Sequence, residues 1–401
     1  MNKIVPISLI CTLAAIPFPV IAAESISDAL ANGDPSLELR YRYEGVDQDG
    51  LSEDAMANTL RTRLGYTSGS YNDFSVTLEF DNVAYIGDED FNSLRNGETA
   101  YPVVADPEGT DLNQSFVTWS GAEGVQAKLG RQRINLNNQR FVGGVGWRQN
   151  EQTYDAASVS YSKDAFSAFY AYVDNVNRIF GPVDGAPAAD LNSDSHMLNL
   201  GYKVSDSLSL GGYLLSLDFE DALALSNETT GLFVEGKFKD LPASPFFRAE
   251  FATQTESKDK AADYDADYSL FELGGSLAGV TLMAGLETLG ADKDAGIAFQ
   301  TPLATAHKFQ GWADKFLATP ASGVVDTYAT AKYAINGFNM AVTYHEFESD
   351  VNSLDYGDEL DAVVSKKFAG RYLVMLKYAD YSADTLATDT SKTWLMVNAS
   401  F

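Results

Sequence analysis

Apolar and polar residues alternate with a period of two along much of this chain. Residues 37–43 show it most clearly, because Leu, Leu, Tyr and Tyr alternate there with Glu, Arg and Arg. The same alternation occurs in residues 60–66, 74–80 and 247–251. A period of two predicts β-strands with one face toward an apolar medium and the other toward a polar one.

The connections between these segments separate a membrane barrel from a soluble sandwich. About eighteen segments have the roughly 9–11 residues of a barrel strand. Long gaps alternate with compact turns, and the long gaps fall near residues 45–57, 83–111, 132–152, 175–194, 219–228, 256–267, 290–324, 348–358 and 382–390. Outer-membrane barrels combine short periplasmic turns with long external loops. We therefore predict an all-β fold, a transmembrane antiparallel β-barrel of about eighteen strands, with sixteen or twenty as the alternatives.

The first 23 residues predict export from the cytoplasm. A short positive start is followed by an apolar run from Ile4 to Val20 and by small residues before Glu24. This is the pattern of a secretory signal peptide, so we expect residues 24–401 to form one barrel domain in a Gram-negative outer membrane. The single cysteine, Cys11, lies in the expected signal peptide, which excludes a disulfide framework or cysteine metal site from the mature chain.

The last predicted strand gives a second indication of an outer-membrane barrel. Residues 393–401 alternate between apolar and other side chains, and they stop on the aromatic Phe401. A closing strand that ends in Phe resembles the address read by the barrel-assembly machinery, which we therefore expect as a partner, together with outer-membrane lipid. The formal charge of −28 argues against nucleic acid as a partner.

The arginines are the first candidates for chemistry, since nine of the twelve lie between residues 40 and 148. Arg40, Arg42, Arg61 and Arg63 alternate with apolar positions on two neighbouring strands, so they should face the lumen together. Guanidinium groups in a pore favour anions. The alternative is structural, because 56 acidic residues are available to pair with them. We predict eight pore-lining or anion-binding cations: Arg40, Arg42, Arg61, Arg63, Arg131, Arg133, Arg140 and Arg148.

The composition of two long loops suggests a role beyond that of a solvent-exposed connection. Residues 130–150 mix glycines, amides, aromatics and arginines, and such a segment could fold inward and narrow the pore. Residues 307–316 interleave basic and aromatic side chains. A sugar-stacking site there and a packed lid without ligand are equal alternatives, and the residues of that candidate site are His307, Lys308, Phe309, Trp312 and Lys315.

An enzyme is the least favoured class. The chain has three histidines, His196, His307 and His345, and none belongs to a serine elbow or a metal-spaced motif. We expect no catalytic residue, no metal site and no cofactor. Calcium or magnesium on the acidic loops has no supporting ligand spacing.

Several stretches resemble the alginate-export family of outer-membrane proteins. They are residues 39–44, 59–64, 130–134, 140–143, 146–156 and 301–317, and the resemblance spans nearly the whole mature chain. It implies an eighteen-stranded barrel with an arginine-rich lumen, which in the founding exporter conducts a polyuronate. This chain is shorter than that exporter, and its later strands contribute few arginines.

Three functions follow from these observations. The first is a porin-like channel for passive diffusion of small hydrophilic solutes, including anionic sugars or uronates. The second is an exporter of an anionic polysaccharide such as alginate, and the third is a barrel enzyme dependent on His345 or His307. The size of an eighteen-stranded lumen favours the channel, because such a barrel encloses an aqueous bore unless a loop fills it.

Overall fold

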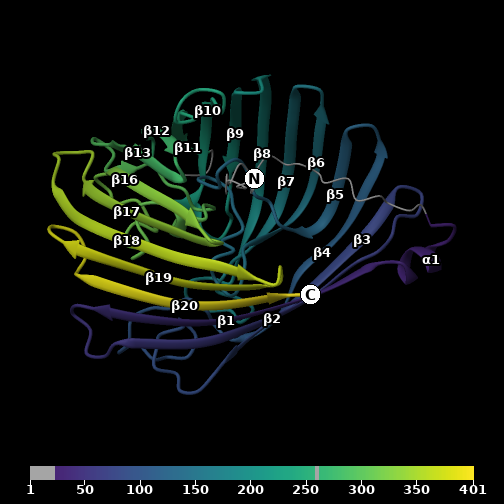
Figure 1. The fold of residues 1–401 in the computed structure, drawn as a ribbon, viewed down its shortest axis with the longest axis horizontal. Helices are drawn as coiled ribbons and strands as arrows, with labels where there is room; N and C mark the ends of the chain where they lie inside the picture. Colours follow the sequence, from purple (N-terminus) through teal and green to yellow (C-terminus); the bar gives the residue numbers. More distant parts are fainter. Residues whose placement is uncertain (1–22, 258–261) are drawn as a thin grey trace.

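Eighteen antiparallel strands close on themselves to form one barrel (Figure 1). The computed structural model describes residues 23–257 and 262–401, so the expected signal peptide lies outside the described residues apart from Ala23. Each barrel strand pairs with the next one along the chain, and β20 pairs with β1 from Glu38↔Ser400 to Gln48↔Thr390. The predicted fold class and strand number are confirmed.

The barrel strands follow the chain in order. Their bounds are β1 (Asp34–Gln48), β2 (Ala55–Thr67), β3 (Phe74–Tyr85), β4 (Gly109–Ala122), β5 (Val125–Gln132), β6 (Thr153–Lys163), β7 (Phe166–Asn177), β8 (Asp190–Ser205), β9 (Leu208–Leu217), β10 (Asn227–Lys237), β11 (Phe246–Glu256), β12 (Asp265–Leu277), β13 (Val280–Leu289), β16 (Val324–Ile335), β17 (Phe338–Glu348), β18 (Asp355–Phe368), β19 (Tyr372–Ala383) and β20 (Thr390–Ser400).

The alternation seen in the sequence separates the two faces of the wall. On β2, Arg61 and Arg63 are buried inside the barrel, whereas Leu64 is 55% exposed on the outside. Its cross-strand partner on β3, Phe80, is also exposed. Lipid covers such an outer apolar surface, and closure leaves no strand edge unpaired in the hydrocarbon.

Connections at the two ends of the barrel differ in length. Turns at the end that holds both termini include two-residue hairpins such as Asn336-Gly337, whose φ angles of 50° and 79° fit a type I′ turn. The opposite end carries the long connections, of which the longest are residues 86–108, 133–152 and 290–323. The first connection, residues 49–54, is shorter than predicted, because β1 continues to Gln48 and β2 begins at Ala55. Val46 and Ala57 of these strand ends are buried in one cluster with Phe91.

Minor elements complete the fold. Helix α1 (Ile26–Ala31) precedes β1, and the 3-10 helices η1 (Leu223–Leu225) and η2 (Ala306–Lys308) lie in loops. Strands β14 (Ala291–Asp292) and β15 (Ile297–Ala298) form a small ribbon between β13 and β16. No helix in the described part of the chain is both long and apolar enough to span a membrane.

Candidate functional site

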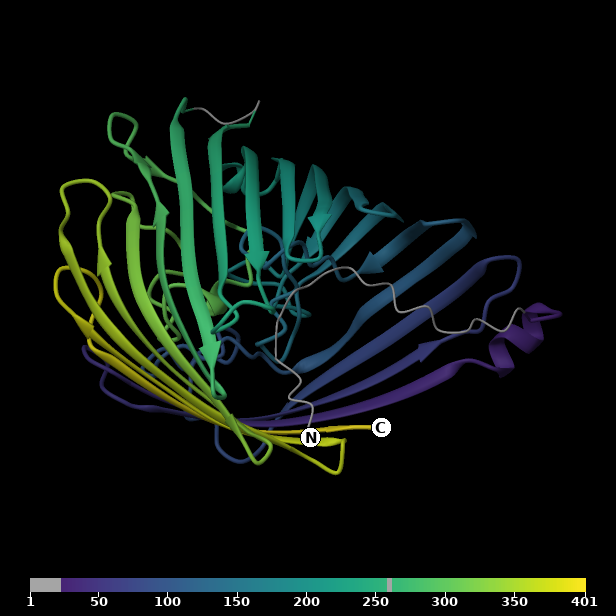
Figure 2. The same ribbon diagram turned by 45° about the horizontal axis from the view of Figure 1, so that its top comes forward.

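Two of the long connections turn into the barrel and meet inside it (Figure 2). We call residues 133–152 the first inner loop and residues 299–323 the second inner loop. The amide of Gly143 donates to the carbonyl of Leu303 at 2.9 Å, and the amide of Thr305 donates to the carbonyl of Gln139 at 3.1 Å. The prediction that the arginine-rich loop folds inward agrees with this arrangement, and the second loop joins it.

An aromatic cluster seats the first inner loop against one side of the wall. The ring of Phe141 lies 4.9 Å from that of Tyr213 on β9 and 5.1 Å from that of Tyr268 on β12. Phe299 of the second inner loop packs on the same ring at 5.8 Å. Buried aromatic contacts of this kind fix the position of the loop, since each ring removes a large apolar area from water.

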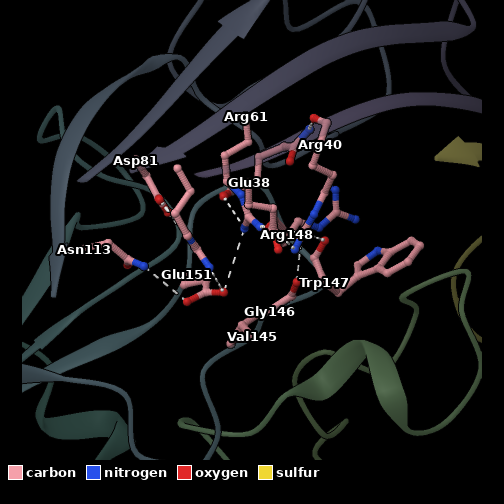
Figure 3. A network of polar contacts seen from close by, with 12 residues as sticks. Glu38, Arg40, Arg61, Asp81, Asn113, Val145, Gly146, Trp147, Arg148 and Glu151 are labelled. Atoms are coloured by element: carbon pink, nitrogen blue, oxygen red, sulfur yellow. Dashed lines mark hydrogen bonds and ion pairs between the residues drawn. The ribbon is translucent and has the colours of Figure 1, made fainter. Parts of the chain in front are cut away.

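The opposite side of the first inner loop is held through its backbone (Figure 3). Arg40 on β1 donates to the carbonyl of Gly146 at 3.0 Å and to the carbonyl of Arg148 at 3.2 Å. Arg42 donates to the carbonyl of Trp147, and its guanidinium lies 4.3 Å from the centre of that indole ring. Both arginines therefore position the loop, because charged donors satisfy carbonyl oxygens that the loop cannot pair internally.

Two arginines of β2 continue this attachment. Arg61 is fully buried and donates to the carbonyl of Gln149 at 3.2 Å and to the Glu38 carboxylate. Arg63 forms a two-pronged pair with Asp81 of β3, with both distances 2.6 Å. Fork-to-fork pairing of this kind fixes the guanidinium plane as well as its charge.

Glu151 is the acidic centre of the first inner loop. Its carboxylate accepts from Arg63 at 2.9 Å, from Arg133, and from the Asn113 amide at 3.2 Å. Burial alone would raise the pKa of Glu151, but Arg133, Arg63 and Arg61 hold it well below its usual range. The side chain is therefore ionised, and it joins the wall arginines to the loop.

Arg148 joins the two inner loops to β1. Its guanidinium lies 3.1 Å from Glu44, 3.6 Å from Asp106 and 3.4 Å from Asp314 of the second inner loop. Burial alone would lower the pKa of Arg148, but these three carboxylates raise it above its usual value. Arg148 therefore remains protonated, and its three ion pairs hold the first inner loop to β1 and to the second inner loop.

Arg140 makes the corresponding junction on the far wall. It is 2% exposed, and its Nε donates to Glu287 of β13 at 2.8 Å. It also donates to Thr301 and to Gln310, both at 3.1 Å. The ring of Phe309 lies 4.8 Å from its guanidinium.

Arg131 differs from the other seven predicted cations. The strand register pairs it with Asp155, and it lies on the same face of β5 as Leu129, which is 66% exposed on the outer wall. Its Nε donates to the Asp155 carboxylate at 2.8 Å. The structure therefore places Arg131 on the outer surface near the loop end, which corrects its expected position in the lumen. Side-chain parity explains this, because Gln132 rather than Arg131 shares the inner face with Lys128.

The other seven arginines are gathered in the lumen, and each has an acidic or carbonyl partner. Arg133 is the most accessible of them, with 27% of its side chain exposed. Sequence reasoning missed the partners, above all Glu44, Glu151, Glu287 and Asp314. The acidic residues of the inner loops could have predicted these pairs, because a charged side chain buried inside a barrel needs an oppositely charged partner.

The second inner loop places its aromatic and basic residues around one wall lysine. The ammonium of Lys377 on β19 lies 3.7 Å from the centre of the Trp312 ring and 4.2 Å from that of Trp147. Its Nζ is 2.6 Å from Nε2 of His307, whose ring stacks on Trp147 at 4.6 Å. These rings are thus in contact with protein groups, as expected for the packed lid.

The remaining members of the predicted sugar-stacking set do not converge with Trp312. Lys308 is exposed and donates to the carbonyl of Asn138 at 2.8 Å. Phe309 packs on Arg140, and the half-buried Lys315 lies 6.0 Å from the centre of the Tyr381 ring. Sugar stacking by these five residues stays a prediction.

His307 gives the second inner loop a dependence on pH. Its Nδ1 lies 2.6 Å from Asp314, so a neutral ring donates there and accepts from Lys377 through Nε2. Burial, and then the charges of Lys377 and Arg148, lower the pKa of His307 from 6.5 to about 3 despite Asp314. The released or unfolded imidazole therefore binds a proton that the seated one does not. The stability contribution is complete above about pH 6.5 and is lost as the pH falls toward 3.

We expect proteolysis of the second inner loop to accelerate progressively between pH 6.5 and pH 4 in the folded barrel. The measurement is limited digestion with an acid-tolerant protease, followed by mass spectrometry of the fragments. The His307→Gln variant should show a flatter dependence across that interval. Equal cleavage of the wild-type loop at both pH values would contradict the assignment.

Acidic partners hold both His307 and His345 in the described part of the chain. His345 on β17 lies 2.9 Å from Asp326, and its other nitrogen lies 3.8 Å from Asp361. His307 contacts Asp314 and Lys377 as described, and neither histidine has a serine partner there. No group of three or more metal-ligating side chains occurs among the described residues.

Solved structures with the same architecture come from Gram-negative outer membranes. OccK9 (OpdG) of Pseudomonas aeruginosa matches with a TM-score of 0.73 at 15% identity, over 93% of this chain and 99% of that one. OccAB4 of Acinetobacter baumannii gives 0.72 at 15% identity, over 92% and 98%. OpdK of P. aeruginosa, solved with vanillate, gives 0.70 at 13% identity, over 93% and 99%. At these identities the likeness establishes the shared fold.

Sequence comparison identifies the family. No curated protein sequence matches the chain. The family model for alginate export matches residues 28–229, which is just over half of the 401 residues and includes the first inner loop. With the closed barrel, this match places the protein in the outer membrane as an integral β-barrel. The chain belongs to the alginate export family.

Proposed function

We propose that this protein is a porin-like channel through which small hydrophilic solutes diffuse, with a preference for anions. The observation that carries the proposal is an eighteen-stranded barrel narrowed by two inner loops that are fixed to its wall. An eighteen-stranded barrel encloses an aqueous bore, and loops folded inside it reduce that bore to the size of small solutes.

The arginines in the lumen support the preference for anions. Arg40, Arg42, Arg61 and Arg63 form a row along one wall, although each is paired or donates to a carbonyl. A solute with a carboxylate can exchange with such partners, because the fork of guanidinium donors fits its two oxygens. OpdK, which was solved with the carboxylate vanillate, shares the architecture.

Export of an anionic polysaccharide is the second candidate, and the alginate-export match favours it. The cross-bonded inner loops weigh against this candidate, since a polymer needs a continuous path past Phe141 and Arg140. Rapid translocation of alginate oligomers through reconstituted barrels, with no more restriction than for monosaccharides, would favour the exporter.

Two macromolecular partners are also proposed. The outward side chains of β2 and β3 would contact lipid, as Leu64, Leu78 and Phe80 are exposed there. The barrel-assembly machinery would read β20 and the exposed Phe401, whose amide donates to the carbonyl of Leu37.

The channel is tested by conductance in a planar bilayer, with the reversal potential measured across a salt gradient. Stepwise openings with anion preference are expected. Replacing the partly exposed Arg133 by Gln should lower the anion-to-cation permeability ratio about twofold, since partly exposed charges contribute only ~0.2–1 kcal/mol. The exposed Arg371 lies in a turn at the opposite end, and Arg371→Gln should leave the ratio unchanged. Cation preference in the wild type would overturn the basic filter, and the absence of steps would overturn the channel.

A further inference from the structure

A small pocket lined by both polar and apolar side chains lies in the inner wall beside the first inner loop. It has a volume of about 60 Å³ and is lined by β5, β6, β7 and the start of that loop. One bound water needs only ~10–15 Å³, so the pocket has room for a carboxylate and the atoms next to it. The strand register brings Lys128 opposite Ser158, and Gln126 opposite Ser160, on this inner face.

Lys128 supplies a wall cation to this pocket. Each of the seven lumen arginines bonds to an acid or a backbone carbonyl, but Lys128 forms no ion pair within the described part of the chain. Its half-buried ammonium instead lies 4.9 Å from the centre of the Phe116 ring. A half-buried ammonium without a counter-ion favours an anion beside it.

The other pocket residues offer neutral hydrogen-bonding groups. Ser158 donates to the side-chain oxygen of Gln132 at 2.7 Å, and Ser160 approaches the carbonyl of Gln126 at 3.4 Å. Hydroxyl and amide groups beside a single cation suit a ligand that carries several hydroxyls next to one carboxylate. The ring of Phe169 supplies an apolar surface at the same place.

The pocket lies where the barrel wall meets the first inner loop. Lys128 lies four residues before the loop end of β5, and the periplasmic turn begins at Glu123. The partly exposed Arg133, the first residue of the first inner loop, also lines the pocket. A carboxylate moving inward would therefore meet Arg133 first and Lys128 next.

We infer that Lys128 and the hydroxyl and amide groups around it form a binding site for hydroxylated carboxylates, such as sugar acids. The inference rests on the proposed channel, for which it names the class of solute. The Lys128 ammonium holds the carboxylate, while Ser160 and Gln126 bind hydroxyl groups of the ligand. Neutral sugars lack the group that Lys128 recognises.

The test is calorimetric titration of the refolded full-length barrel in detergent, with sodium glucuronate as the probe. Wild-type protein should bind glucuronate and should not bind glucose at the same concentration. Lys128→Gln should weaken glucuronate binding at least about tenfold, in line with the ~1.5–3 kcal/mol of a charged hydrogen bond. Lys203→Gln is the matched control, because Lys203 is exposed and pairs with Asp206 at a turn. Its affinity should equal that of the wild type.

Other outcomes have separate meanings. Unchanged affinity in Lys128→Gln, equal binding of glucose, or no glucuronate binding at all would each overturn the site. Planar-bilayer conductance of the same preparation tests the channel independently. Glucuronate binding without conductance would support the binding site and overturn the diffusion channel. Conductance without glucuronate binding would support the channel and overturn the binding site.

Discussion

Replacing Glu151 by alanine is expected to release the first inner loop from the wall and to increase single-channel conductance. Its carboxylate joins Arg63 to Arg133 and also accepts from Asn113. The variant removes one of the two acids that Arg63 and Arg133 share, and it leaves Glu79 of β3 as their common partner. Hydrogen bonds to charged groups contribute ~1.5–3 kcal/mol each, and the variant removes all three that the Glu151 carboxylate accepts. The measurement is single-channel recording in planar bilayers.

Two variants make this result interpretable. Glu151→Gln keeps the size and the acceptor oxygen but removes the charge, so its conductance should lie between those of wild type and Glu151→Ala. Glu123→Ala is the matched control, because Glu123 is an exposed turn residue 3.9 Å from Lys163. Wild-type conductance in Glu151→Ala would contradict the role of this carboxylate as the anchor.

Replacing Arg140 by alanine should cause the largest loss of stability. The change leaves Glu287 buried without its cation and removes the donor to Gln310 and Thr301. Loss of one partner of a buried ion pair costs ~3–5 kcal/mol, because the remaining charge stays desolvated. Urea unfolding of the refolded barrel, followed by intrinsic fluorescence, measures the free energy of unfolding.

A double variant separates the buried charge from the lost contacts. Arg140→Leu combined with Glu287→Leu removes both charges and should recover most of the stability, because apolar replacements of a buried pair are often neutral. Lys163→Ala, at an exposed pair, should change the free energy of unfolding by less than ~1 kcal/mol. A loss in the double variant as large as in Arg140→Ala would attribute the effect to packing.

The fold was predictable because its determinants are local. Alternation in residues 37–43 follows directly from a wall with water on one side and lipid on the other, and β1 covers that stretch. The long and short connections reveal the two ends of the barrel. The predicted connection at residues 45–57 proved too long, since Val46 and Ala55 are buried against loop residues rather than lipid. Local patterns do not report such contacts between distant loops.

The candidate site was predictable only in part. Side-chain parity put Arg40, Arg42, Arg61 and Arg63 inside correctly, but it says nothing of what they bind. Arg140 and its partner Glu287 are separated by 147 positions in the chain. Such pairs depend on closure of the whole barrel, so no short window contains both partners. The position of Arg131 was predicted wrongly, because a shift of one residue at the end of a strand moves a side chain from the lumen to the outer surface.

The cross-bonding of the inner loops also sets an order of events during biogenesis. Arg40 reaches Gly146 across 106 positions, and Arg140 reaches Gln310 across 170. The first inner loop thus cannot form all of its contacts with the wall until both β1 and β13 are in place. The loops can therefore constrict the barrel only where the wall strands on both sides of them are in place. Because an unconstricted barrel would pass solutes without selection, the affinity of the loops for the wall bears on the integrity of the envelope.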